Sequence, residues 1–357
     1  MKAPVFTIPV LVMLSSASVM AQQAIPFAGD RNVTVMTQNV YNGVDAELSA
    51  LPTAKSFSDL LNKVATVYKG YFDRKFPERA AALAAEIEAK RPDFIGLQEA
   101  ILVRTQTPPD GPKTPATTVA LDYVQILLDA LAKRGLKYKV VVQSINLDVE
   151  LPSDLGIDVR HTDREVILAR ADLKTADLKL SNAQGGNFVT NCIIPSPITG
   201  PITLQRGWVA VDAKIRGKSL RLISTHLDAA CLPSPDIQQK QVVELLNGPA
   251  ATQLPVVLLG DFNSPGDGSG EAYNDLFAAG FADAAFKAGV GSIPTCCQNA
   301  DLLNSVSALN SRIDFVLFRG TIKALSADVV GDNSADRTPS GLWPSDHAGV
   351  AATLVFP

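Results

Sequence analysis

The stretch Pro255–Asn263, PVVLLGDFN, decides the fold class of this chain. Residues 255–260 form a nearly continuous apolar run, which is typical of a strand buried inside an α/β protein. The run stops on Asp261 and Asn263, whose polar side chains would lie at the rim of a sheet. A carboxylate buried at such a rim is unfavourable unless a cation or a polar partner compensates its charge. The stretch therefore predicts both a buried strand and a polar site at its end.

Other apolar stretches end in the same way. A lone strand-end Asp is usually a turn or cap residue, and His226 alone is as well explained as a hydrogen-bonded core histidine. The repeated pattern is what favours a functional site built from several strand ends. The residues in question are Asn39 after Val33–Gln38, Glu99 after Asp93–Gln98, His226 after Leu220–Thr225, Asp314 within Arg312–Val316, and Asp346 and His347 before the last strand.

Apolar periodicity predicts an alternation of strands and helices in both halves of the chain. Because hairpins occur within each half, we expect two mixed sheets packed face to face with helices outside, an α/β (α+β) four-layer sandwich. Loops are predicted at Thr105–Thr118, Gln184–Leu204 and Gly266–Gly270. The predicted strands are Val33–Val40, Asp93–Gln98, Lys137–Ile145, Glu165–Ala169, Gly207–Ile215, Leu220–His226, Pro255–Gly260, Ile313–Phe318 and Gly349–Phe356, and the predicted helices are Phe57–Phe72, Glu78–Lys90, Val119–Arg134 and Ile237–Leu246.

The first 21 residues have the pattern of a secretory signal peptide. Lys2 precedes the apolar run Val5–Met13, and Val19-Met20-Ala21 fits a small-residue cleavage site. The run is too short for a transmembrane anchor, and no later stretch is long and apolar enough to span a bilayer. We therefore expect a signal peptide over residues 1–21 and a single catalytic domain over residues 22–357, secreted or periplasmic.

Charge and cysteine content narrow the function further. The net charge of −4 leaves no basic surface for a stable nucleic-acid complex, although a hydrolase that contacts a few phosphates remains compatible. Four cysteines in an oxidising compartment predict disulfides, with three pairings open and a bond between the adjacent Cys296 and Cys297 the uncommon one. The other two are Cys192 and Cys231. Nothing in the sequence indicates more than a monomer.

Six short motifs, taken in order, resemble those of the endonuclease/exonuclease/phosphatase superfamily. That superfamily includes DNase I, apurinic endonucleases, neutral sphingomyelinases and inositol polyphosphate phosphatases. The resemblance spans about Val33 to Val355, and it implies a DNase I-like four-layer sandwich and a Mg²⁺-dependent phosphoesterase of the secreted bacterial type. The motifs are Thr37-Gln38-Asn39, Leu97-Gln98-Glu99, Ser224–Leu227, Gly260–Asn263, Arg312–Val316 and Ser345-Asp346-His347.

The resemblance also implies roles for individual residues. Glu99 and Asp346 would be metal ligands, and Asn39 would lie near the metal and the phosphate. Asp261 and Asn263 would position the nucleophilic water and the phosphate, and Asp314 would orient His347. His226 is typical of the DNase I, sphingomyelinase and inositol phosphatase members rather than of apurinic endonucleases. DNase I-like members also keep an acidic residue that pairs with the histidine at position 226. In the stretch His161–Arg170, Asp163 lies at that acidic position. We prefer it to Glu165, because Glu165 begins the apolar run.

The predicted reaction is hydrolysis of a P–O bond by metal-assisted attack of water. His347, oriented by Asp314, would deprotonate the water, although Asp261 is an open alternative. His226 would donate a hydrogen bond to the phosphate and act as the acid, with Asn39 and Asn263 as neutral donors. Arg206 is equally compatible with a phosphate contact and with a structural role. The predicted metal is Mg²⁺, with Mn²⁺ or Ca²⁺ as alternatives.

The substrate stays open between nucleic acid, a phospholipid head group and a small phosphoester. The first alternative to an unassigned phosphodiesterase is a sphingomyelinase-like phospholipase C, which would need an apolar, aromatic loop at a membrane surface. The chain has only two tryptophans, Trp208 and Trp343, and no clear aromatic hairpin. A second alternative, a non-catalytic binding protein on the same scaffold, predicts missing motif residues, yet all are present.

Overall fold

The computed structural model describes residue 1 and residues 32–356, except residues 230, 232 and 233. Apart from Met1, the predicted signal peptide lies outside the described residues, so its cleavage stays a prediction. The described residues from Asn32 to Phe356 belong to one compact unit. None of the helices in the described ranges is long and apolar enough to cross a membrane.

The first sheet has eight strands and mixes parallel with antiparallel pairs. Its centre is the parallel pair β1 and β2, in which Asn39 pairs with Gln98 in register. The parallel pairing places the carboxyl ends of both strands, and therefore Asn39 and Glu99, at one edge. The strand order is β15 (Lys323–Val330), β16 (Gly349–Val355), β1 (Asn32–Asn39), β2 (Phe94–Gln98), β6 (Asp158–Arg170), β3 (Leu102–Gln106) and β4 (Thr118–Asp122), with β5 (Tyr138–Pro152) also pairing with β6.

The second sheet has six strands. β11 and β12 are parallel, with His226 opposite Asp261, and Asp261 is opposite Asp314 on the antiparallel neighbour β14. The predicted hairpin between β10 and β11 is confirmed, with positive φ at both Arg216 and Gly217, as a two-residue turn of the primed type requires. The strand order is β13 (Ala282–Asp283), β14 (Asp314–Arg319), β12 (Val256–Asp261), β11 (Lys218–His226), β10 (Gly207–Ile215) and β7 (Leu178–Asn187).

The two sheets pack face to face through an apolar core that includes Val35 and Phe94 of the first and Leu222 and Val257 of the second. Gly96 lies at their close approach, because a Cβ there would be 2.7 Å from the Ser224 hydroxyl of the facing sheet. Residue 96 therefore has no room for a side chain in this packing.

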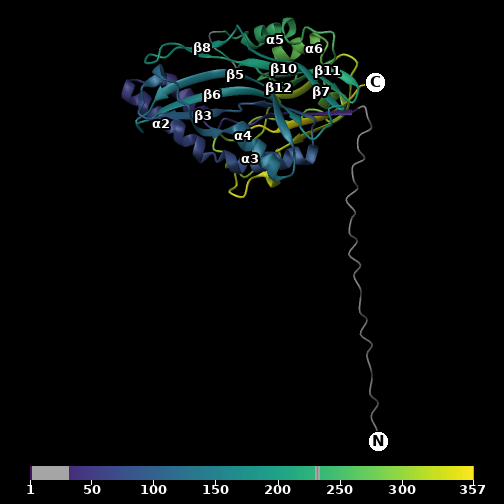
Figure 1. The fold of residues 1–357 in the computed structure, drawn as a ribbon, viewed down its shortest axis with the longest axis horizontal. Coiled ribbons are helices and arrows are strands. Elements are labelled where there is room, and N and C mark those ends of the chain that lie inside the picture. Colours follow the sequence, from purple (N-terminus) through teal and green to yellow (C-terminus); the bar gives the residue numbers. More distant parts are fainter. Residues whose placement is uncertain (2–31, 230, 232–233, 357) are drawn as a thin grey trace. The chain divides into compact units, whose positions relative to one another are not determined.

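Helices cover the outer face of each sheet (Figure 1). The prediction of two mixed sheets packed face to face with helices outside is confirmed. The first sheet carries α2 (Phe57–Asp73), α3 (Phe76–Lys90) and α4 (Tyr123–Lys133), and the second carries α5 (Ile237–Asn247) and α6 (Glu271–Ala278). The short helices are α1 (Asp45–Ala50), α7 (Ala284–Lys287) and the 3-10 turns η1 (Leu51–Thr53), η2 (Gly111–Lys113) and η3 (Ser334–Asp336).

Two sequence predictions about local structure are wrong. The helix predicted over Val119–Arg134 begins only at Tyr123 in the structure, because Thr118–Asp122 is the strand β4. The Asp122 carboxylate caps α4 by accepting from the backbone N–H groups of Val124 and Gln125. The predicted loop Gln184–Leu204 contains the end of β7 and a two-stranded ribbon of β8 (Cys192–Ile194) and β9 (Ile202–Leu204). The cysteines form the disulfides Cys192–Cys231 and Cys296–Cys297.

Candidate active site

The strand ends of the two sheets meet at one place, as the recurring motifs predict. Asn39 connects the sheets, because its Nδ2 donates to Glu99 Oε1 and to Asp261 Oδ2, at 3.1 Å each. Its Oδ1 accepts from the Tyr41 backbone N–H at 2.9 Å. In this structure Asn39 is therefore a brace between two carboxylates, and its carbonyl oxygen is already used by the backbone.

Glu99 is held rigidly at the end of β2. It is 8% exposed, and its Oε2 accepts from both the backbone and the side-chain nitrogen of Asn42, at 2.8 and 2.7 Å. Burial, with the nearby carboxylates of Asp45 and Asp346, raises the pKa of Glu99 well above its usual value. Burial also raises the pKa of Asp346 to about 7. Asp346 has His347 and Arg79 as positive neighbours, whereas the charged groups that act on Glu99 among the described residues are other carboxylates.

The donor set at this point fits a hard divalent cation. Carboxylate oxygens are the ligands that Mg²⁺ prefers, and it needs only one or two of them beside water and phosphate. Glu99 and Asp346 both line the same pocket. A cation between them would supply the counter-charge that burial makes necessary. Asp261, Asp314 and His347 also bring ligand atoms within 4.8 Å of one another.

His347 and Asp314 form the predicted pair. The Nδ1 of His347 lies 2.8 Å from Asp314 Oδ2 and 3.7 Å from Asp261 Oδ2. Burial disfavours the charged ring, but the carboxylates of Asp314, Asp346 and Asp261 outweigh it and raise the pKa of His347 well above its usual value. Burial also raises the pKa of Asp261 to about 6. The ring nitrogen Nε2 is left to face the pocket, beside Cys297 Sγ at 3.9 Å.

His226 has the opposite environment. Its Nδ1 lies 3.0 Å from Arg206 Nη1 and its Nε2 lies 3.1 Å from Asn263 Nδ2. Burial, the Arg206 guanidinium and His347 lower the pKa of His226 well below its usual value. Because Arg206 can only donate, Nδ1 of His226 accepts from it, and the ring proton then lies on Nε2. The acceptor nearest to that proton is Asp261 Oδ2, at 3.4 Å from Nε2, whereas the Asn263 amide nitrogen beside it donates to the Leu227 carbonyl.

The direct pair expected between His226 and Asp163 is not present. Arg206 lies between them, with its Nη1 3.7 Å from Asp163 Oδ2 and its Nε 3.6 Å from Asp228. Asp163 instead accepts from Asn146 Nδ2 at 3.2 Å, and that same amide lies 3.4 Å from Glu165. Asp163 therefore reaches the histidine only through Arg206, which hydrogen-bonds His226 and forms a longer ion pair with Asp163.

Three supporting residues were not predicted. Asn42 binds Glu99, Asn146 holds Asp163, and Arg79 on α3 donates to the carbonyls of Val40, Tyr41 and Pro344. Arg79 is fully buried, and it ties the segment after β1 to the segment before Asp346. A buried arginine within an apolar helix face was the one available signal, because charged residues are rarely buried without partners.

These groups surround one pocket of about 380 Å³. The predicted site residues all line it except Asn39 and Asp314, which lie behind Asp261 and His347 and position them. Arg206 and Asn42 also line it. The pocket therefore brings together the candidate metal ligands, both histidines and a fixed positive charge, as a phosphate site requires.

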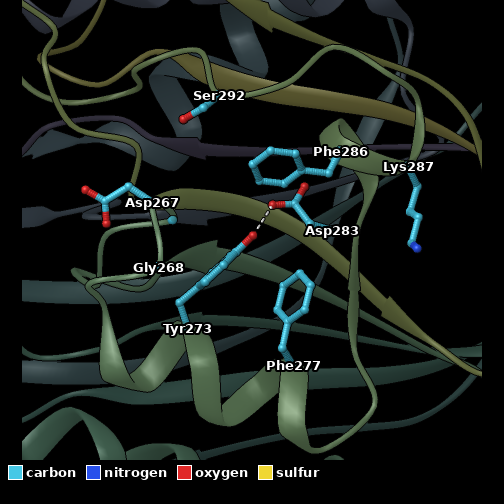
Figure 2. Close-up of a pocket in the computed structure, with 9 residues that line it drawn as sticks. Asp267, Gly268, Tyr273, Phe277, Asp283, Phe286, Lys287 and Ser292 are labelled. Atoms are coloured by element: carbon cyan, nitrogen blue, oxygen red, sulfur yellow. Dashed lines mark hydrogen bonds between the residues drawn. The ribbon is translucent and has the colours of Figure 1, made fainter.

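A second hollow, of about 480 Å³, contains none of the predicted residues. Figure 2 shows Tyr273 and Phe277 on α6 facing Phe286, with the Tyr273 hydroxyl donating to Asp283 at 2.9 Å. Asp283 also pairs with Arg312 at 2.7 Å. Because Arg312 is two residues before Asp314, this buried ion pair secures the start of β14 behind the active site.

The site residues, from Asn39 to His347, all lie within one stretch that matches a known protein family. Residues 36–347 match the profile described as the Endonuclease/Exonuclease/phosphatase family. The chain belongs to the endonuclease/exonuclease/phosphatase family. Members generally are metal-dependent phosphoesterases, and the buried group Asp261, Asp314 and His347 of this chain could hold a metal ion. A comparison with curated protein sequences finds no significant match.

Solved structures of this family have the same fold. A family member from Leptotrichia buccalis C-1013-b aligns with a TM-score of 0.56 and 16% identity, covering 91% of this chain and 100% of that one. The human Nocturnin catalytic domain with bound sulfate aligns at 0.54 and 17%, covering 92% and 94%. A mannosyl-6-phosphatase from Bacteroides thetaiotaomicron aligns at 0.51 and 16%, covering 91% and 100%. At such identities the likeness concerns the fold alone.

Proposed function

We propose that this family member is a Mg²⁺-dependent phosphodiesterase that hydrolyses a P–O bond by attack of water. One observation carries the proposal: Asn39 joins Glu99 to Asp261 while the His347–Asp314 pair faces the same pocket. Mn²⁺ or Ca²⁺ would fit the same oxygen donors. The complete set of polar groups argues against a non-catalytic binding protein, which would have no need of a buried histidine–carboxylate pair.

The proposed mechanism uses the chain's own residues as follows. Asn263 and the Nε2–H of His226 donate to the phosphate, and Arg206 fixes that tautomer. His347, held by Asp314 at Nδ1, exchanges a proton through Nε2 with the attacking water, with Asp261 beside it as the alternative base. Held by Glu99, which Asn39 braces, and by Asp346, Mg²⁺ would neutralise the phosphate oxygens and stabilise the leaving oxygen.

We also propose that the enzyme acts outside the cytoplasm, secreted or in a periplasm. The support is the signal-like sequence of residues 1–21 together with the Cys192–Cys231 disulfide, a bond that persists in oxidising compartments.

The test of the activity is release of p-nitrophenol from bis(p-nitrophenyl) phosphate by the protein from residue 22 onward. We expect turnover with Mg²⁺, none with EDTA, and a loss of about 10²-fold or more in His347→Ala. Asp267→Ala, an exposed carboxylate outside the pocket, is the control. Absence of turnover with Mg²⁺, Mn²⁺ or Ca²⁺ in folded protein, as judged by a cooperative thermal transition, would overturn the diesterase proposal. Turnover of p-nitrophenyl phosphate instead would identify a monoesterase.

A further inference from the structure

One side of the active-site pocket is an aliphatic wall that the proposed chemistry does not use. Its side chains come from three separate parts of the fold: the α1–η1 segment, one face of β5 and the β8–β9 ribbon. We call this set the aliphatic wall. Six of its residues carry the argument, namely Leu147, Val149, Leu151, Ile194, Ile202 and Leu204.

The pattern of each strand directs these residues to the pocket. Leu147, Val149 and Leu151 alternate along β5, so they share one face of the strand. In the ribbon, Ile194 is opposite Ile202, and both are half-buried. The opposite face of the ribbon carries Ile193 and Thr203, which are exposed. The wall is thus one face of each strand rather than a scatter of surface residues.

The ribbon is fixed beside the histidine site. The Cys192–Cys231 disulfide joins its first residue to the segment that follows β11, five residues beyond His226. Cys192 and Cys231 also pack with Ile237 of α5, and Leu204 packs against this cluster. The wall and the phosphate site are therefore held in a constant relation by a covalent bond and a small apolar core.

The wall differs from the core of the protein in its exposure. Core leucines such as Leu222 and Leu259 are fully buried, whereas the six wall residues are only half-buried and border an open pocket. Contiguous aliphatic surface left in contact with water next to a polar site is typical of ligand-binding clefts.

The composition of the pocket argues against a nucleic-acid strand as the group that covers the wall. Among the described lining residues none is Phe, Tyr or Trp, so there is no platform for base stacking. Arg206 is the only Lys or Arg among them, against the carboxylates of Asp45, Glu99, Asp163, Asp261 and Asp346. A groove that follows a polyanionic backbone needs the reverse balance.

We propose, resting on the phosphodiesterase activity proposed above, that the substrate is an amphipathic phosphodiester. Its phosphate lies between His226 and His347, and an aliphatic chain on one ester oxygen lies along Leu147, Val149, Leu151, Ile194, Ile202 and Leu204. Water attacks phosphorus, the bond to the other ester oxygen breaks, and the products are the alkyl phosphate, the released alcohol or phenol, and any proton lost at the working pH.

The experiment compares octyl p-nitrophenyl phosphate with methyl p-nitrophenyl phosphate, both monomeric in solution, through release of p-nitrophenolate. Each buried methylene should raise kcat/KM by up to about fourfold, equivalent to about 0.8 kcal/mol per CH₂. We expect an octyl-to-methyl ratio of at least about tenfold for the wild type. The ratio falls toward one in Ile202→Asn and Leu204→Asn, whereas Ile193→Asn, on the exposed face of the same ribbon, leaves both rates unchanged.

The outcomes separate the two proposals. Equal turnover of both esters overturns the chain-binding proposal and leaves the phosphodiesterase intact, as does faster turnover of thymidine 5′-(p-nitrophenyl) phosphate than of the octyl ester. If neither ester is turned over, the phosphodiesterase proposal fails, and calorimetric binding of octyl phosphate against methyl phosphate decides the subsite. Tighter octyl binding that is lost in Ile202→Asn supports it, and equal binding overturns it.

A last experiment distinguishes whether the aliphatic chain of the natural substrate belongs to a membrane lipid or to a dispersed molecule. Vesicles of phosphatidylcholine report a membrane lipid, and a monomeric short-chain phosphatidylcholine reports a dispersed one. Release of choline from either, with phosphatidic acid as the other product, supports an aliphatic phosphodiester as substrate. Release from the monomeric form alone assigns a dispersed substrate.

Discussion

Two histidines a few ångströms from the same Asp261 carboxylate have opposite charge preferences. His347 is surrounded by Asp314, Asp346 and Asp261, which favour its protonated ring, whereas His226 receives a hydrogen bond from Arg206, which favours its neutral ring. When neighbouring groups have environments that move their pKa values apart, acid and base roles become separable. A cation bound at Glu99 and Asp346 would oppose the charge on His347 and bring its pKa down toward neutrality.

Asp314→Asn tests the pair at His347. Loss of the carboxylate removes a negative charge that raises the pKa of His347, so this pKa should fall. In EDTA, the pH midpoint of the His347 ring signals in ¹H–¹⁵N spectra should move to lower pH, and with Mg²⁺ kcat/KM should drop by about 10²- to 10⁴-fold. The chain has only three histidines, which makes assignment simple. Asp267→Asn, the same charge change at an exposed site, should alter neither quantity; an unmoved midpoint in Asp314→Asn would contradict the pairing.

Arg206→Gln tests the residue that replaces the expected Asp163 contact. The guanidinium lowers the pKa of His226 and donates to its Nδ1, so the variant should raise that pKa while burial keeps it below the usual value. If Arg206 also contacts the phosphate, inhibition by inorganic phosphate should weaken about tenfold or more, as expected for a charged hydrogen bond. Lys287→Gln, which removes a positive charge at the second hollow, is the control. A purely structural Arg206 would leave phosphate inhibition unchanged.

Single residues were predictable where a strand carried them. Asn39, Glu99, His226, Asp261 and Asp314 follow or begin apolar strands, and strand pairing brings such ends together. The contacts of Arg206 and Asn42 were not predictable, because both lie in loops whose side-chain partners come from distant segments. His226 and Asp163 do lie near each other, as expected, but Arg206 lies between them. Sequence spacing does not reveal that a third side chain will come between two groups.

Long helices and fully buried strands were predicted to within a few residues. Phe57–Phe72, Glu78–Lys90 and Pro255–Gly260 correspond closely to α2, α3 and β12. The half-buried elements were missed or shortened: β5 runs well beyond its predicted range, and β8 and β9 lay in a predicted loop. β6 is an exception among the buried strands, because it is almost entirely buried but begins well before its predicted start, in a stretch of polar residues. Short strands that bury one face against a pocket carry little apolar periodicity, so tertiary contacts rather than local pattern define them.

Glu86 on α3 provides a test at the level of one helix. It is 8% exposed, neither carboxylate oxygen has a partner among the described residues, and burial with Asp336 and Asp332 raises its pKa to about 8. Because the pKa of Glu86 is raised from 4.5, the contribution of Glu86 to the stability of the folded state is fully present below pH 4.5. That contribution is lost as pH rises through about 8.

Glu86→Gln should therefore raise the free energy of unfolding at pH 8.5 and change it little at pH 5. At about 1.4 kcal/mol per pKa unit, the gain is at most about 5 kcal/mol. Urea unfolding at the two pH values measures it. Glu88→Gln on the same helix, where the carboxylate is exposed beside Arg134, is the matched control and should change little at either pH. Equal effects of Glu86→Gln at both pH values would contradict the raised pKa.

At the scale of the whole molecule, each layer has one task. The inter-sheet core holds the two sets of strand ends in register, and the helices on the outer faces bury the remaining apolar surface. The site needs both sheets, because Glu99 comes from one and Asp261 from the other, with Asn39 as the link. A carboxylate cluster of this kind is assembled by the tertiary fold, which explains why its motifs are short and scattered along the sequence.

Export and disulfide formation make a joint prediction about the whole chain. The full sequence, expressed in a bacterium, should be recovered outside the cytoplasm beginning at Gln22, and N-terminal sequencing checks this. A version without residues 2–21 should stay in the cytoplasm with the thiols of Cys192 and Cys231 free. Closing a loop of 39 residues is worth about 4 kcal/mol in the chain-entropy model, so this version should melt roughly 5–10 °C lower. Oxidation after purification should restore the melting temperature, except in Cys192→Ser. A full-length chain that stays in the cytoplasm and still begins at Met1 would contradict the export proposal. Such a chain would have no oxidising compartment to maintain the Cys192–Cys231 disulfide.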